Sequence, residues 1–471
     1  MNKRITIISC VSLGCAVVIA TAGLTTKNNN SDLIQVGQID ASIEPSIEQS
    51  IEPSMEPLSN EDVMDEQVET LHTSTPETIT PSSNPEDAVN KSSAKPQETT
   101  KPQVTSKPKT VNNTYKSTMY DYSKAGVKSA TGRVVPEDYI SVTEFGVTPN
   151  SGNDVSGKVE KAIYSATQKG KYLYFPEGTY YMKNVKIYDA DNVKICGAGE
   201  KTIIKTANDA TGDVWDIVLG IYNSNGPIVR NLVFDGNNKV VPGNLTVGVI
   251  QLRLENCDNA KVYGCRFQNN NSGNLNIVDE AKNLEVFYCD FLNSDCSIIT
   301  SPGYITKGYL CNNFIDGQDW KYSEPISLYY AEDRGTNTDV IISGNDIRNH
   351  DNGAGAIFIT YPSTNISILN NYIYKCGAGI GSGSQRQVET STLGPVGITA
   401  KNNVIDTPTW HGFGLLYADN WTITDNVIKN VTDGFGVFLD QCDNNTVKNN
   451  NLGGSRVFEE NCSGNSFSGN K

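Results

Sequence analysis

The C-terminal part of the chain alternates apolar and polar residues in short runs that are separated by one or two polar positions. One stretch contains three such runs in succession, GLLYAD (414–419), WTIT (421–424) and VIKN (427–430). A period of two is typical of half-buried β-strands. The joint between the second and third runs contains only Asp425 and Asn426. We therefore predict a unit of three short strands joined by tight corners.

The same unit recurs along the chain. Before the third run of each unit stands an asparagine, or in two units a cysteine, followed two positions later by a β-prone apolar residue. These positions are Asn231, Cys265, Cys289, Asn312, Asn345, Asn371, Asn403, Asn426, Asn450 and Asn465. Spacings of 23 to 24 residues recur, and the longer spacings contain insertions. Self-similarity at such a period indicates a solenoid.

The recurring asparagine has a physical explanation. Asparagine tolerates the left-handed backbone that a tight corner needs, and its amide both donates and accepts hydrogen bonds. We predict an all-β fold, a three-sided parallel β-helix of roughly ten coils. In it the asparagines form a ladder along the corner between the second and third strands. Cys265 and Cys289 would take the same place as small buried residues.

The N-terminal side of the repeats contains a distinct module at residues 140–187. In it a Phe145-Gly146 turn precedes Asn153-Asp154, and a helix follows with Val159, Ile163 and Ala166 on its apolar face. The sequences YFPEGTY (174–180) and VKICGAG (193–199) come next. These features resemble the N-terminal module of the pectate lyase-like superfamily. The resemblance covers about residues 138–471 and implies a single-stranded right-handed parallel β-helix with an N-terminal capping helix. That superfamily includes lyases, glycoside hydrolases, epimerases and non-catalytic surface proteins, so the resemblance implies fold more strongly than function.

Two segments precede the predicted fold. In residues 1–24 a basic start, Lys3-Arg4, is followed by a long apolar run that ends in Ala-Thr-Ala, as in a secretory signal peptide. The run is also long enough to remain as a membrane anchor. Residues 25–115 form a linker rich in Ser, Thr, Pro and Glu, in which a packed core is not expected. We predict an exported protein, secreted or held at the cell surface near the cell wall or membrane, with its β-helix domain at 116–471.

Charge and cysteine content narrow the function classes. Residues 28–109 hold 15 acidic and 5 basic residues, which accounts for −10 of the net charge of −15. No basic stripe is present, so we expect no nucleic-acid partner. Of 11 cysteines, Cys10 and Cys15 lie in the export segment, and no C-x-x-C pair occurs among the other nine. We expect mostly buried free thiols and a monomer.

Insertions between the third run of one unit and the first run of the next predict a groove. They lie at 316–325, at 348–355, around the strand at 378–383, and at 406–413. Loops of this kind wall one face of a solenoid, and in the resembled superfamily polysaccharide lies on this face. By the period of two we expect these residues to face outward: Arg253, Glu255, Asn276, Val278, Ile298, Thr300, Leu328, Tyr330, Phe358, Thr360, Leu415, Tyr417, Phe438 and Asp440. Leu252, Leu254, Leu275, Ile277, Ser327, Tyr329, Ile357, Ile359, Val437 and Leu439 are expected to face inward.

Candidate chemistry follows from the polar and aromatic residues of this groove. The catalytic candidates are Asp316, Asp319, Glu332, Asp333, Arg334, His350, Asp351, Arg386 and His411. The substrate-binding candidates are Trp320, Tyr330, Phe358, Trp410 and Tyr417. Glycoside hydrolysis needs two carboxyl groups, which Asp316/Asp319 or Glu332/Asp333 would supply. β-Elimination instead needs a base such as Arg334, Arg386, His350 or His411. We expect a cofactor, Ca²⁺ held by Asp side chains, only if the reaction is β-elimination.

Simpler structural roles compete with each of these assignments. Asp residues in turns often cap backbone N–H groups, and the aromatic residues would equally form a small core beneath the loops. The catalytic motifs of the polygalacturonases and of the calcium pectate lyases are absent, except for a fragment in WHGFG (410–414). Our leading hypothesis is an exported enzyme that cleaves a pectin-like or other acidic polysaccharide by hydrolysis or β-elimination. The alternatives are a non-catalytic cell-surface β-helix that binds glycan or protein, and a sugar epimerase.

Overall fold

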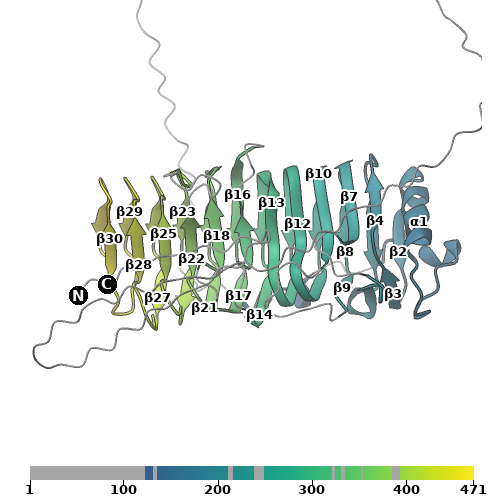
Figure 1. The fold of residues 1–471 in the computed structure, drawn as a ribbon, viewed down its shortest axis with the longest axis horizontal. Helices are drawn as coiled ribbons and strands as arrows, with labels where there is room; N and C mark the ends of the chain where they lie inside the picture. Colours follow the sequence, from purple (N-terminus) through teal and green to yellow (C-terminus); the bar gives the residue numbers. More distant parts are fainter. Residues whose placement is uncertain are drawn as a thin grey trace, which may run out of the picture. The chain divides into compact units, whose positions relative to one another are not determined.

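In the computed structural model the chain forms a parallel β-helix of stacked coils (Figure 1). The structure describes residues 122–130, 135–210, 216–237, 249–320, 324–329, 335–351, 354–383 and 393–471. The predicted export segment (1–24) and linker (25–115) lie outside the described residues. The all-β parallel solenoid predicted from the sequence is confirmed.

Three sheets run along the stack, and the strands in each are paired in parallel. β12 (Arg266–Phe287) and β13 (Asp290–Cys311) each turn two corners and take part in all three sheets. The first sheet also contains β4 (Val185–Tyr188), β7 (Ile217–Asn225), β10 (Ile250–Asp258), β15 (Ile326–Leu328), β18 (Ile357–Thr360), β22 (Ile380–Gly383), β25 (Phe413–Leu416), β28 (Val437–Asp440) and β30 (Val457–Glu460).

The second and third sheets follow in each coil. The second contains β1 (Tyr139–Ser141), β2 (Tyr172–Phe175), β5 (Lys194–Gly197), β8 (Ile228–Arg230), β11 (Lys261–Tyr263), β16 (Asn337–Ser343), β20 (Ser367–Leu369), β23 (Thr399–Lys401), β26 (Thr422–Thr424), β29 (Thr446–Lys448) and β31 (Ser466–Ser468), and the short β19 (Ser363–Thr364) pairs with the start of β16. The third contains β3 (Gly178–Met182), β6 (Thr202–Thr206), β9 (Val233–Asp235), β14 (Phe314–Trp320), β17 (Asp346–His350), β21 (Tyr372–Cys376), β24 (Val404–Asp406) and β27 (Val427–Lys429).

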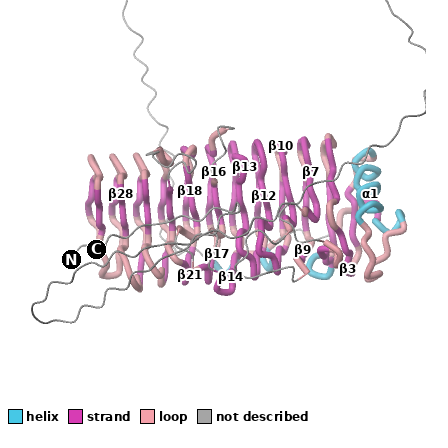
Figure 2. The backbone as a smooth tube through the Cα atoms, viewed as in Figure 1, coloured by secondary structure: helices cyan, strands magenta, loops and turns pink. Residues whose placement is uncertain are grey.

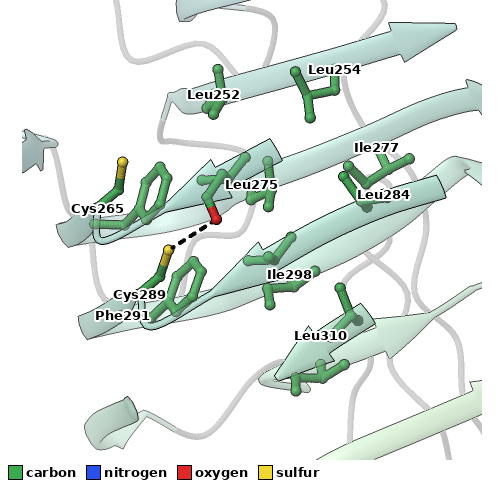
Figure 3. Packing of buried hydrophobic residues seen from close by; sticks show 14 of the residues in the cluster. Leu252, Leu254, Cys265, Leu275, Ile277, Leu284, Cys289, Phe291, Ile298 and Leu310 are labelled. Carbon is green, nitrogen blue, oxygen red and sulfur yellow. Dashed lines mark hydrogen bonds between the residues drawn. The ribbon is translucent and has the colours of Figure 1, made fainter. Parts of the chain in front are cut away.

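The core lies between the three sheets because every second residue of each strand points inward. Leu252, Leu275 and Ile298 pair in register on successive coils and are fully buried, and Figure 3 shows them stacked in one column with their neighbours. Phe267 and Phe291 stack in the same way, with ring centroids 5.0 Å apart. Each coil thus covers the apolar side chains of the previous one.

The predicted capping helix is α1 (Ser156–Gln168), which lies at the N-terminal end of the stack beside β2 and β4 (Figures 1 and 2). Val159, Ile163 and Ala166 are buried, as the sequence pattern predicted. The Phe145-Gly146 turn ends the 3₁₀ helix η3 (Val142–Phe145), and Gly146 has a φ of 71°. A second short 3₁₀ helix, η4 (Gly199–Lys201), precedes β6.

The asparagine ladder is present at the corner between the second and third sheets. From Asn345 onward, the side-chain oxygen of each ladder asparagine accepts both the backbone N–H and the side-chain N–H of the ladder asparagine one coil earlier, at 2.9–3.1 Å. The members are Asn313, Asn345, Asn371, Asn403, Asn426, Asn450 and Asn470. Cys289 takes the same place as predicted, because its backbone N–H donates to Asn313 Oδ1 at 3.0 Å.

The structure corrects the prediction in two respects. The left-handed residue is the one before the ladder residue, for example Asn402 with φ 57° and Asp425 with φ 59°. One residue therefore turns the corner, and the next residue links the coils. Three predicted ladder positions shift as a result. Asn231 and Asn312 are corner residues, and Asn465 belongs to a second ladder, where it accepts from Asn445 at 2.8 Å.

The cysteines of the β-helix are free thiols, as expected. Eight are buried and Cys462 is partly exposed. Burial raises the pKa of Cys196, Cys257, Cys265, Cys311, Cys376 and Cys442 to about 12. Among the described residues, no helix has the length and apolar character needed to cross a membrane.

Candidate functional site

The outer face of the first sheet follows the predicted register in four places. Arg253, Asn276, Phe358 and Phe438 alternate with core residues and therefore face outward. In three other coils the prediction is wrong by one residue. Ile298 and Thr300 pair with the inward residues Leu275 and Ile277, Leu328 pairs with Thr300, and Leu415 pairs with the inward residue Leu439. Ser327 pairs with Phe358 and therefore faces outward.

The middle of this outer face is covered by a small apolar cluster. It consists of Cys296, Ile299, Tyr329, Ala354 and Phe358 and is separate from the main core. Phe358 is only 3% exposed, and its ring lies 6.0 Å from that of Tyr329. Its ring therefore packs against protein, which is the small-core alternative that the sequence left open.

His350 is the last residue of β17 in the third sheet and is fully buried. In the described part of the chain neither ring nitrogen has a hydrogen-bond partner. Burial lowers the pKa of His350 to about 3, so the ring is neutral at physiological pH. The backbone carbonyl of His350 accepts the N–H of Gly377 at 2.8 Å. A buried neutral ring of this kind fills space between coils.

His411 belongs to a stack of aromatic rings in the last coils. We call His411, Phe435, Phe438 and Phe458 the C-terminal aromatic group. The His411 ring is 4.8 Å from Phe438 and nearly parallel to it, and Phe435 lies 4.7 Å from Phe458 at 11°. Nδ1 of His411 accepts the backbone N–H of Phe435 at 3.1 Å. Burial lowers the pKa of His411 to about 4, partly opposed by the charge of Asp433, so His411 is a neutral ring with a fixed orientation.

An open pocket of about 500 Å³ lies beside this group. Its walls are Asn430, Val431, Gly434, Phe435, Gly453, Gly454, Ser455 and Arg456. The exposed guanidinium of Arg456 lies over the Phe435 ring, 5.2 Å from its centroid. Pockets that combine an aromatic wall with a few polar groups are typical ligand sites.

The other described candidates are engaged in local contacts. Asp316 accepts the side-chain N–H of Asn349 at 2.9 Å and the backbone N–H of Gln318 at 3.1 Å. Asp351 accepts the hydroxyl of Thr409 at 2.9 Å. Tyr417 is a corner residue with φ 56°, and its hydroxyl accepts from Gln441 at 3.1 Å. Trp410 is half-buried, and its ring meets that of His411 edge-on at 6.5 Å.

The remaining candidates are not placed. Tyr330, Glu332, Asp333, Arg334 and Arg386 lie outside the described residues, and so do the side chains of Asp319 and Trp320 in β14. Among the described residues, no three His, Cys, Asp or Glu side chains group as ligands for a metal ion.

Sequence reasoning missed Phe435, Phe458 and Arg456. The last coil is only about 20 residues long, as the spacing of Asn445 and Asn465 shows. Asn465 lies at a different corner from the main ladder, so the predicted repeat does not pair Phe458 with Phe438, as the structure does. The signal was nevertheless present, since FGVFLD (435–440) and VFEE (457–460) each place an acidic residue two positions after a phenylalanine.

Two carboxylates stand next to the aromatic group. Asp440 and Glu460 pair in register on adjacent strands, two residues beyond Phe438 and Phe458, so that their backbones are about 4.8 Å apart. Asp440 accepts the side-chain N–H of Asn461 at 3.0 Å. The C-terminal coils thus bring aromatic, cationic and carboxylate groups together, whereas the predicted candidates at 316 and 351 form turn contacts.

Comparison with known proteins establishes the fold. Residues 326–471 match a family described as "Right handed beta helix region". The crystal structure of the Dettilon tailspike protein (gp208) is similar, with a TM-score of 0.51, 16% identity, and coverage of 71% of this chain and 67% of that one. The chain therefore has a right-handed parallel β-helix fold, as the N-terminal module implied. No curated protein matches the chain in sequence.

Two further structures show lower similarity. PfbA, a surface adhesin of Streptococcus pneumoniae, has a TM-score of 0.48 at 14% identity, with 71% of this chain and 92% of that one covered. An exopolygalacturonase from Thermotoga maritima has a TM-score of 0.43 at 11% identity, with 71% and 93% covered. The first is named as an adhesin and the second as an exopolygalacturonase.

Proposed function

We propose that this right-handed parallel β-helix is an exported glycan-acting protein that holds a polysaccharide at the C-terminal aromatic group. The observation that supports the proposal is that Phe435 and Arg456 line one open pocket, while Phe458 stacks on Phe435. Aromatic faces offer a large rigid contact area to the apolar face of a sugar ring. The guanidinium of Arg456 favours a sugar that carries a carboxylate or another anionic group.

A second candidate function, hydrolysis of the bound polysaccharide, is favoured by the placement of Asp440 and Glu460. Glycoside hydrolysis needs two carboxyl groups about 5 to 10 Å apart, and these two carboxylates occupy the same position on adjacent strands. One would protonate the departing sugar oxygen while the other acts as nucleophile or activates water. No described basic side chain besides Arg456 lines the pocket, so β-elimination would depend on Arg456 or on residues outside the described part.

The test uses the full chain and a panel of neutral and acidic polysaccharides. Binding is measured by calorimetry, and products are followed both as reducing ends and as the ultraviolet absorbance of unsaturated sugars. Binding without product assigns a glycan-binding protein, and reducing ends without absorbance assign a hydrolase. Absorbance assigns a lyase. Absence of both binding and product across the panel would contradict the proposed function.

A further inference from the structure

Residues 122–130 precede the first strand of the β-helix in sequence but lie against its third sheet at β12, β13 and β14. They form two single-turn 3₁₀ helices, η1 (Tyr122–Lys124) and η2 (Val127–Ser129). The N–H of Gly126 donates to the carbonyl of Asn312 at 2.8 Å, and a side chain at Gly264 would contact Ala130. We call residues 122–130 the strap.

The strap is held by a buried carboxylate. Oδ1 of Asp290 accepts the backbone N–H of Val127 at 2.9 Å. Oδ2 accepts from Nε and Nη2 of Arg266, at 3.2 and 3.0 Å. The Asp290 side chain is 10% exposed. A carboxylate in this position needs donors to compensate for its lost hydration, and the strap supplies one of them.

The fit of the strap depends on residue type. Ala125 and Val127 are buried at 1% and 3% exposure. Gly126 has a φ of 85°, and a Cβ there would collide with Oδ1 of Asp290 and lie 2.8 Å from Cβ of Phe314. The ammonium group of Lys128 lies over the Phe314 ring, 5.9 Å from its centroid. The order of residue types at positions 125 to 128 (small, glycine, apolar, basic) therefore suits the surface of the third sheet that these residues contact.

We propose that Arg266, Asp290 and Phe314 form a peptide-binding site on the third sheet, which the chain fills with its own residues 125–128. The ligand class is a short peptide with a small residue, glycine, an apolar residue and lysine in that order. Filling the site holds residues 125–128 against the third sheet. Intramolecular binding has a high effective concentration, so the site stays occupied unless the strap is weakened. This proposal does not depend on the glycan-binding proposal.

The experiment compares the full chain with its Gly126→Ala variant. Gly152→Ala is the matched control, because Gly152 has a φ of 74° but a Cβ at that position would meet no atom within 4 Å. Trypsin cleavage after Lys124 and Lys128 is mapped by mass spectrometry. Binding of a labelled synthetic peptide, YSKAGVKSA (122–130), is measured by fluorescence anisotropy. We expect faster cleavage and peptide binding only in Gly126→Ala.

A second variant tests the carboxylate. Adding Asp290→Asn to Gly126→Ala keeps the shape of the side chain and is expected to weaken peptide binding at least about tenfold, because the charge that the N–H and Arg266 share is removed. The proposal is overturned if wild-type and Gly126→Ala proteins are cleaved alike. It is also overturned if the peptide binds neither protein, or binds both equally.

Discussion

Asn403 and Asn426 are joined by two hydrogen bonds across neighbouring coils. Oδ1 of Asn426 accepts the backbone N–H of Asn403 at 2.9 Å and its side-chain N–H at 3.0 Å. Nδ2 of Asn426 donates to the carbonyl of Ala400 at 3.0 Å and to Asn450 at 2.9 Å. One buried side chain thus links its own coil to the coils before and after it, and these contacts fix the register of the stack.

Replacing Asn426 with alanine is expected to destabilise the β-helix by about 2 to 4 kcal/mol. The change leaves the buried N–H groups of Asn403 and the carbonyl of Ala400 without partners, and each buried unsatisfied group costs about 1 to 3 kcal/mol, with partial relief by relaxation. Urea unfolding followed by circular dichroism measures the loss.

Asn402→Gly is the control for this prediction. Asn402 is exposed and left-handed, with φ 57°, and glycine adopts that conformation without strain. Its free energy of unfolding is expected to stay within about 0.5 kcal/mol of the wild type. Equal losses in the two variants would show that corner geometry, rather than the ladder, supports the stack.

His350 is expected to make stability depend on pH. Folding lowers the pKa of His350 from 6.5 to about 3, so the fold favours the neutral ring. The stability contributed by this neutral ring is fully present above pH 6.5 and is lost as pH falls toward 3. At about 1.4 kcal/mol per pH unit, the loss is on the order of 4 to 5 kcal/mol.

The measurement compares wild type with His350→Leu in urea unfolding at pH 7 and pH 4. Leucine carries no titrating group, so the variant is expected to lose less stability between the two pH values. His411→Leu is expected to show a smaller effect, since the pKa of His411 is lowered only to about 4. If the stability of wild type and His350→Leu depends on pH in the same way, His350 is not the cause of the pH dependence.

Phe435→Ala is expected to weaken polysaccharide binding at least about tenfold, because the variant removes the ring on which Arg456 lies. Arg456→Gln is expected to weaken binding of acidic polysaccharides more than that of neutral ones. Calorimetric titration of each variant with the best ligand of the panel measures both effects.

Phe467→Ser is the matched control for the aromatic site. Phe467 is 40% exposed, but it lies on β31 in the second sheet rather than beside the pocket. Its replacement is expected to leave binding unchanged. If Phe435→Ala binds like the wild type while Phe467→Ser does not, the site lies on another face.

The features that the sequence predicted correctly are those in which the same contact repeats in every coil. A ladder asparagine such as Asn371 or Asn403 contacts an identical residue in the coil before and the coil after. The repeat period of the sequence is therefore enough to predict the ladder. The apolar face of α1 was equally predictable, because Val159, Ile163 and Ala166 follow the helical period.

The parts that could not be predicted depend on contacts between unlike residues. The strand around Ile298 and Ile299 is apolar on both faces, so its alternation does not show which side points inward, and a shift of one residue exchanges the two faces. The contacts of the strap could not be predicted from the sequence for another reason. Its site joins Val127 to Asp290 across 163 positions, and that contact occurs once.

Gly434 offers a last test, because it lies where two coils approach closely. A Cβ at Gly434 would collide with the carbonyl oxygen of Trp410 and lie 2.6 Å from Nδ1 of His411. Gly434→Ala is therefore expected to push the Phe435 loop away from His411, break the hydrogen bond between them, and lower stability by about 1 to 3 kcal/mol. Glycan affinity should fall with it, because Phe435 forms one wall of the pocket.

Gly454 lines the same pocket, and its replacement is the control that separates the effect of close approach from the effect of backbone strain. Its φ is 86°, but a Cβ there would meet no atom within 4 Å. Gly454→Ala is expected to cost about 1 to 2 kcal/mol through left-handed strain alone and to keep its glycan affinity. Thermal unfolding measures the stability of both variants, and calorimetry measures their glycan affinity. Retained affinity in Gly434→Ala would mean that the position of Phe435 does not control binding, since only this substitution displaces the loop that carries the ring.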